Sequence, residues 1–137
     1  MAYLKLPDAE IYYEVYGKGR PFLFCSATGV DGQCWKANQV PEFSRDHQVI
    51  LFDYRGTGRS SKPSDGLHAK FPRYDYADIV TAQHRLVTEK FGVTHLRLLL
   101  GTSMGAMQAW MWAETYPAVS DAFVALASNP VAIGGRN

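Results

Sequence analysis

The sequence predicts an α/β fold: a mostly parallel sheet with helices on both faces, preceded by an antiparallel hairpin. Short apolar runs of strand type alternate along the chain with longer segments of helical periodicity. Two short alternating segments flank the turn at Pro7-Asp8, and a Gly-rich turn follows at 17–19. Because strands that alternate with helices form parallel sheets covered on both faces, we expect about six strands in a single domain spanning 1–137.

The parallel part of the expected sheet comes from four apolar runs. The hairpin leads into a run at 22–25, and "HQVILFDYRG" supplies a buried strand that ends at Asp53. Residues 54–73 carry several glycines and prolines, which predicts a long loop. Two further strands are expected at 94–100 and 119–127.

Helices are expected between these runs. Residues 33–46 are helical only weakly, because Pro41 interrupts them. After the long loop, apolar residues recur at helical spacing, with Asp75 as a candidate cap and Gly92 as the stop. The segment "MGAMQAWMWAETYP" is apolar on nearly all sides, so it predicts a buried helix that stops before Pro117.

The composition of the chain limits which classes of function are possible. A chain of 137 residues that is 47% hydrophobic can bury a core of its own. Its net charge of +1 arises from 14 basic and 13 acidic side chains spread along the chain, which excludes the basic footprint of nucleic-acid or anionic-membrane binding. No apolar stretch reaches transmembrane length, and the first twenty residues lack the pattern of a secretory signal.

The two cysteines indicate a reducing compartment. Cys25 lies inside an apolar run and Cys34 follows nine residues later, a pattern that does not resemble a disulfide framework. We expect both to be reduced packing residues in a cytoplasmic protein.

The motif with the most chemical content is Gly101-Thr102-Ser103-Met104-Gly105, which fits G-x-S-x-G where an expected strand meets an expected helix. Small residues two positions before and two positions after Ser103 let the chain turn sharply and project the hydroxyl from the tip of an elbow. The helix N-terminus directs free N–H groups at negative charge that develops on a substrate. Ser103 is therefore a nucleophile candidate; the alternative is that it only caps the helix.

The order of these segments resembles a known family. The hairpin, the Gly-rich turn, "VILFDYRGTGRSSKP" and the elbow resemble the N-terminal half of the α/β-hydrolase fold, over nearly the whole chain. Within it, "GTSMGAMQAWMWAETYP" is similar to homoserine O-acetyltransferases and related hydrolases, whereas residues 1–64 look more like esterases and lactonases. The resemblance implies a serine-dependent ester hydrolase or O-acyltransferase that acts on a small acyl or ester substrate, with no metal and no organic cofactor.

The resemblance also implies an oxyanion hole made of two backbone N–H groups. Met104, the residue after the candidate nucleophile, fits the first position. The second falls in "CSATGVDG", where relatives carry His-Gly and this chain has Ser26 followed by Ala27 and Thr28. Because the donor is a backbone group, Thr28 or Ala27 can serve; the alternative is a plain connecting loop.

The segment from Asp53 to Ser60 matches the D-x-R-G-x-G-x-S signature of the same superfamily. Its glycines permit a tight loop, and we expect Asp53 and Arg55 to hold it through hydrogen bonds and a charge pair. A phosphate-binding function is excluded, because "GTGRSSK" matches neither G-x-x-x-x-G-K-[ST] nor G-x-G-x-x-G.

The sequence does not offer a clear general base or orienting acid for Ser103. In this fold the acid and the histidine follow the serine in the chain, and no histidine follows Ser103. His47 and His95 precede expected strands, at the end of the sheet opposite the elbow, His84 lies within a helix, and only His68 lies in a loop with freedom to reach. Among the polar residues after the serine, Glu114 lies near a helix end, Asp121 lies at the wrong end of its strand, and Asn129 lies at the catalytic end without an acidic group.

The family's last two strands, with the loops that bring the acid and the histidine, and its lid are absent from this sequence. The chain therefore resembles a truncated hydrolase whose last strand, at 119–127, has an unpaired edge. This edge predicts a homo-oligomer. Two functions stay open: an acyl-transfer enzyme, and a non-catalytic fragment or self-associating interaction module.

Overall fold

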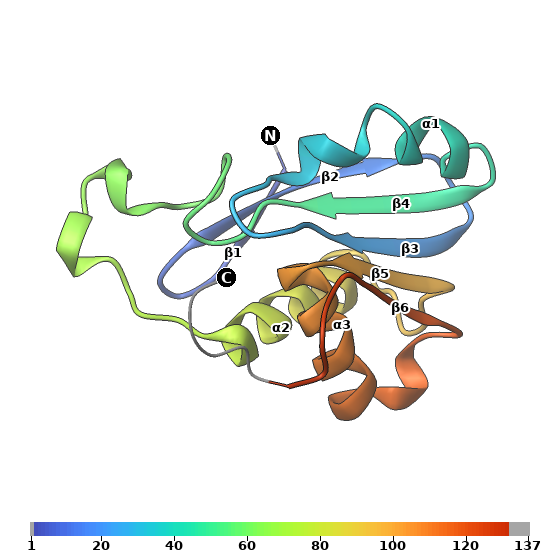
Figure 1. Cartoon of the computed structure of the whole chain (residues 1–137). Helices are drawn as coiled ribbons and strands as arrows, with labels where there is room; N and C mark the ends of the chain where they lie inside the picture. Colours follow the sequence, from blue (N-terminus) through green and yellow to red (C-terminus); the bar gives the residue numbers. More distant parts are fainter. Residues whose placement is uncertain (1, 132–137) are drawn as a thin grey trace.

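Six strands form one mixed sheet in the computed structural model, which describes residues 2–131 (Figure 1). Their order across the sheet is β1-β2-β4-β3-β5-β6. The pairs β1/β2 and β2/β4 are antiparallel, and the pairs β4/β3, β3/β5 and β5/β6 are parallel. The strand bounds are β1 Tyr3–Lys5, β2 Glu10–Tyr16, β3 Arg20–Cys25, β4 His47–Phe52, β5 Leu98–Thr102 and β6 Phe123–Leu126. The expected antiparallel hairpin and parallel sheet are both confirmed.

Helices cover both faces of the sheet. The 3₁₀ turn η1 (Gly32–Trp35) and α1 (Gln39–Phe43) lie on one side, and α2 (Tyr76–Arg85) and α3 (Met104–Thr115) on the other (Figure 1). Two apolar clusters fill these layers. The side chains of Phe24, Trp35 and Val40 pack in the cluster under α1. The larger cluster joins β1–β4 to α2 and α3, so both halves of the sequence contribute to one core.

The helical segments differ in detail from the expectation. Residues 33–46 form the two short pieces η1 and α1, and Pro41 is tolerated because it lies in the first turn of α1, where no intrahelical N–H is needed. Asp75 caps α2 through a reciprocal pair of hydrogen bonds with Asp78. The helix continues as a π-helical turn, η4 (Leu86–Lys90), and the chain turns at Gly92 with φ +62°.

The long loop and the later strands are more irregular than the apolar runs suggested. The loop holds two 3₁₀ turns, η2 (Pro63–Asp65) and η3 (His68–Lys70). β5 begins at Leu98, because Leu96 makes only an isolated bridge to Ser120. β6 is limited to four residues, and the turn η5 (Pro117–Val119) occupies the start of the expected strand.

Two expectations about burial are wrong. Cys25 is fully buried, and burial raises the pKa of its thiol, but Cys34 is exposed because it lies on the outer side of η1 while Trp35 fills the core. α3 is buried on one face only: Ala109 and Trp112 are fully buried, whereas Trp110 is 40% exposed.

Candidate active site

The candidate site is the sharp turn between β5 and α3. Ser103 is the one residue between them, with φ 53° and ψ −117°, and its side chain is exposed. A non-glycine residue at positive φ costs on the order of 1–3 kcal/mol, so the surrounding structure must hold it. Part of this restraint comes from the Ser103 N–H, which donates to the Leu126 carbonyl at the end of β6 over 2.9 Å.

Close backbone packing explains the two glycines of the elbow. A Cβ atom at Gly101 would lie 2.1 Å from the Gly105 carbonyl oxygen, and a Cβ atom at Gly105 would lie 2.2 Å from the Cys25 carbonyl oxygen. No side chain fits at either distance. The first turn of α3 therefore lies directly against the ends of β5 and β3.

The Ser103 hydroxyl does not cap α3. The N–H groups of Ala106 and Met107 donate to the backbone carbonyl of Ser103, over 3.0 and 3.1 Å, and the side chain makes no capping hydrogen bond. Ser103 occupies the N-cap position through its backbone alone, and the alternative that its side chain caps the helix is wrong. Because Met104 is the first residue of α3, its N–H has no partner within the helix.

A cleft of about 520 Å³ opens at the elbow. Its lining brings together Ser103, Met104 and Thr28, which the sequence placed in one site, and adds Glu114 and Asn129. Ser128, also in this lining, has a buried hydroxyl that has no hydrogen-bond partner in the described part of the chain. A second cleft of about 640 Å³ adjoins the first, since Thr28, Tyr76, Met104 and Met111 line both.

The two proposed donors of the loop after β3 differ in position. Thr28 is exposed and lines both clefts, whereas Ala27 is half-buried and lines neither. The Val30 N–H donates to the Ala27 carbonyl over 3.2 Å and closes a turn. Between residues 2 and 131, no group accepts a hydrogen bond from the N–H of Thr28.

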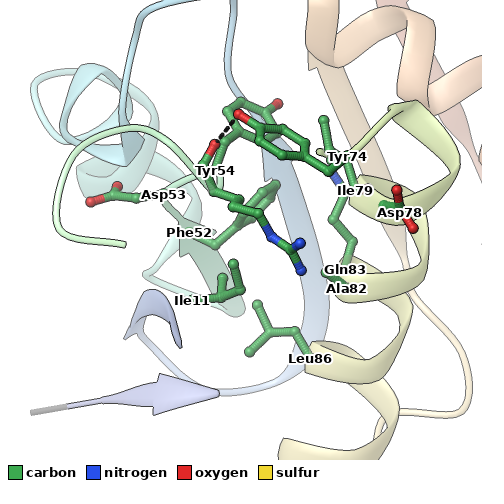
Figure 2. A pocket seen from close by; sticks show the side chains of 11 residues that line it. Ile11, Phe52, Asp53, Tyr54, Tyr74, Asp78, Ile79, Ala82, Gln83 and Leu86 are labelled. Atoms are coloured by element: carbon green, nitrogen blue, oxygen red, sulfur yellow. Dashed lines mark hydrogen bonds between the residues drawn. The ribbon is translucent and has the colours of Figure 1, made fainter. Parts of the chain in front are cut away.

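The segment from Asp53 to Ser60 supports this loop. The buried Asp53 carboxylate accepts from the Gly32 N–H over 2.9 Å and from the Arg59 N–H over 2.8 Å. Arg55 forms its charge pair with Asp8, through two hydrogen bonds of 2.8 and 3.0 Å. The expected hydrogen bonds and charge pair both occur; Arg59 lies within the segment, whereas Gly32 and Asp8 are 21 and 47 positions away from their partners. Figure 2 shows a further pocket, which shares Tyr54 and Arg55 with the second cleft. In it, the Asp53 side chain points away from Ile11 and Leu86.

A protein-family model described as the alpha/beta hydrolase fold matches residues 20–135. The chain belongs to the α/β-hydrolase fold family. A homoserine O-acetyltransferase from Chlorobaculum parvum is 32% identical over 97% of this chain, which spans 41% of that protein. An ethyl acetate hydrolase from Pseudomonas veronii is 42% identical over 50% of this chain and 21% of that protein.

Solved structures agree on the fold. A hydrolase from Pseudomonas aeruginosa superimposes with a TM-score of 0.74 at 24% identity, over 87% of this chain and 42% of that one. The chain thus spans about two fifths of the length of the Pseudomonas aeruginosa hydrolase and of the homoserine O-acetyltransferase.

None of the four histidines of this α/β-hydrolase chain lines the cleft at Ser103. His47 begins β4 and packs on Phe22, and the His95 ring contacts Asp121 over 2.7 Å, both at the opposite end of the sheet as expected. His84 stacks on Tyr116 at 4.2 Å between ring centroids. His68 lies in the turn η3 of the long loop.

The described part of the chain holds neither a cluster of metal-ligating side chains nor a membrane-spanning helix. Within residues 2–131, no three His, Cys, Asp or Glu side chains are grouped as a metal site would require. No helix in this range combines the length and the apolar character that a membrane crossing requires.

Sequence patterns do not point to two residues that line these clefts, Ser128 in the first and Tyr54 in the second. The Ser128 hydroxyl and the Tyr54 phenol lie after strand ends, where sequence offers no periodic signal for side-chain direction. Asn129 lines the cleft, as its place after the catalytic end of β6 predicts.

Proposed function

We propose that the chain carries the nucleophile of a serine-dependent acyl-transfer enzyme, an ester hydrolase or O-acyltransferase, with Ser103 as that nucleophile. The observation that supports it best is the conformation of Ser103: a strained backbone holds an exposed hydroxyl, free of capping bonds, at the N-terminus of α3. Strain of this kind persists where the surrounding structure enforces it, and such positions cluster at active sites.

The reaction follows from this position. The Ser103 hydroxyl loses its proton to a base or to water, its oxygen attacks the acyl carbonyl carbon to form a new C–O bond, and the carbonyl electron pair moves onto oxygen. The N–H of Met104 and that of Thr28 or Ala27 stabilise this oxyanion. The bond to the leaving alcohol then breaks, the alcohol takes up a proton, and water or an acceptor hydroxyl later releases the acyl group.

The serine needs a proton acceptor. By position, His68 is the first histidine to test, because it lies in a long loop and not in a strand or α-helix. Without a base, an oxyanion hole and substrate positioning still retain part of the catalysis. We therefore propose slow activity for the chain alone, on small acyl esters, a substrate class supported by the names of its acetyltransferase and ethyl acetate hydrolase relatives.

Labelling with a fluorophosphonate, followed by intact-mass and peptide mapping at neutral and alkaline pH, tests this function. We expect one label per chain on the peptide that contains Ser103, and none after Ser103→Ala. Ser64→Ala is the matched control, because Ser64 is exposed in the long loop, and it should label like the wild type. Absence of labelling at both pH values would show that Ser103 is not a nucleophile.

We propose a second, non-catalytic function as a self-associating module, because of the free edge of β6. In the described range β6 pairs only with β5, and Leu126 at its end is 50% exposed. An open edge of this kind offers unpaired N–H and C=O groups to a second copy. A monomeric mass by light scattering at micromolar concentration would contradict it.

We further propose a single domain over 1–137 in the cytoplasm.

A further inference from the structure

A buried hydrogen bond connects the segment after β4 to the loop after β3. The Tyr54 hydroxyl donates to the Ser26 carbonyl over 2.7 Å, and both residues are at most 2% exposed. Ser26 is the first residue after β3 and opens the loop that carries Ala27 and Thr28.

The same carbonyl lies against the elbow. A Cβ atom at Gly105 would stand 2.6 Å from the Ser26 carbonyl oxygen. The Ser26–Ala27 peptide is therefore held between α3, which begins directly after Ser103, and the Tyr54 hydroxyl. No residue other than glycine at 105 would allow this contact.

Because the peptide group is planar, a contact that fixes the Ser26 carbonyl also fixes the direction of the Ala27 N–H group. The described chain has no cis peptide bonds, so the Ala27 N–H points away from the Ser26 carbonyl and hence away from Tyr54. The following peptide is fixed in the same manner, since the Val30 N–H holds the Ala27 carbonyl and so orients the Thr28 N–H. The Trp35 indole N–H donates to the Ser26 hydroxyl over 2.9 Å and completes the restraint.

We propose that Tyr54 is a positioning residue that acts through the Ser26 carbonyl to orient the loop N–H donors of the oxyanion hole. This inference rests on the proposed function of Ser103. Tyr54 touches no substrate in this role. Burial raises the pKa of Tyr54 well above its usual value, which keeps the hydroxyl a donor.

Tyr54→Phe removes the hydroxyl and keeps the ring that packs on Phe52 at 5.0 Å between centroids. With p-nitrophenyl acetate, kcat should fall about 10- to 100-fold with KM little changed, because a displaced oxyanion donor weakens only the transition state. Fluorophosphonate labelling should slow by a similar factor. Replacing Tyr54 by 4-aminophenylalanine, which places an N–H donor near the same position, should restore most of the rate.

Tyr16→Phe is the matched control. The Tyr16 hydroxyl also makes one hydrogen bond, to Glu14 over 2.8 Å, at the end of the sheet away from Ser103. Its kcat and labelling rate should equal those of the wild type. Wild-type kinetics in Tyr54→Phe, or an equal loss in Tyr16→Phe, would overturn the inference.

The amide resonances of Ala27 and Thr28 provide a readout that does not depend on catalysis. In ¹H–¹⁵N spectra, Tyr54→Phe should shift these two amides and speed their hydrogen exchange, and 4-aminophenylalanine should reverse both changes. If wild-type Ser103 takes no label, the proposed function fails while this readout still decides the role of Tyr54. Unchanged amides would overturn it. Should Tyr54→Phe fail to fold, amides of the 4-aminophenylalanine protein that match wild type support the inference, and altered ones contradict it.

Discussion

The Trp112 indole N–H donates to the Gln83 side-chain oxygen over 2.7 Å, inside the layer between α2 and α3. The Gln83 amide in turn donates to the side-chain oxygen of Gln108, and all three side chains are at most 2% exposed. Gln83 thus satisfies polar groups from two different turns of α3. Gln83 therefore links α2 to α3 by polar contacts, in addition to the apolar core that the two helices share.

Gln83→Leu should therefore destabilise the protein. The change leaves the Trp112 N–H and the Gln108 oxygen buried without partners, so we expect the free energy of unfolding to fall by about 2–4 kcal/mol. Urea unfolding followed by tryptophan fluorescence measures it. Gln33→Leu, at an exposed position of η1, should stay within about 0.5 kcal/mol of wild type. A similar small change for Gln83→Leu would contradict the importance of this network.

Gly105→Ala should be far more damaging than an alanine at a glycine in open space. The new Cβ atom would overlap the Cys25 carbonyl, and backbone atoms on both sides must move, at about 3 kcal/mol or more. Gly29→Ala is the control, because its Cβ meets nothing within 4 Å and its φ of +70° costs about 1 kcal/mol. Thermal unfolding of both variants compares the two costs; equal shifts would refute the close packing.

Acid should destabilise the protein through Glu14. Burial alone would raise its pKa, but hydrogen bonds from Lys36, Tyr12 and Tyr16 outweigh burial and lower the pKa to about 2. A carboxyl group whose pKa is depressed by folding stabilises the folded state above its unfolded pKa of 4.5, and this stabilisation is lost as pH falls toward 2. Lys36→Met should flatten the fall in stability between pH 5 and about pH 2, as followed by urea midpoints.

Leu126→Lys should weaken self-association through β6. A lysine at an exposed edge position disfavours pairing with another strand. Light scattering across a concentration series should show a lower mass than for wild type. Leu67→Lys is the matched control, because Leu67 is 49% exposed in the long loop and belongs to no strand. If both variants assemble as wild type does, the edge is not the interface.

Local signals predicted the scaffold well. The elbow was predictable because a strand-type run, G-x-S-x-G and an apolar helix follow one another, and the positive φ of Ser103 agrees with that context. Strand ends were less predictable. Leu96 is fully buried although it precedes β5 and belongs to no strand, so the apolar run in the sequence begins before the strand does.

Contacts between distant segments could not be predicted. Tyr54 and Ser26 are 28 positions apart, and Arg55 and Asp8 are 47 apart, so neither pairing leaves a periodic trace. The exposure of Cys34 was also not predictable. In a turn as short as η1, the sequence does not show which side faces solvent, even beside the buried Trp35.

The bond from the Ser103 N–H to the Leu126 carbonyl has a consequence for regulation. The final residue of the outermost strand holds the backbone of the candidate nucleophile, and the same strand offers the open edge. A molecule that adds a strand to β6 would therefore stiffen or displace the anchor of Ser103 without entering the cleft. The proposed assembly at β6 and the proposed reactivity of Ser103 would then be thermodynamically linked through one carbonyl group.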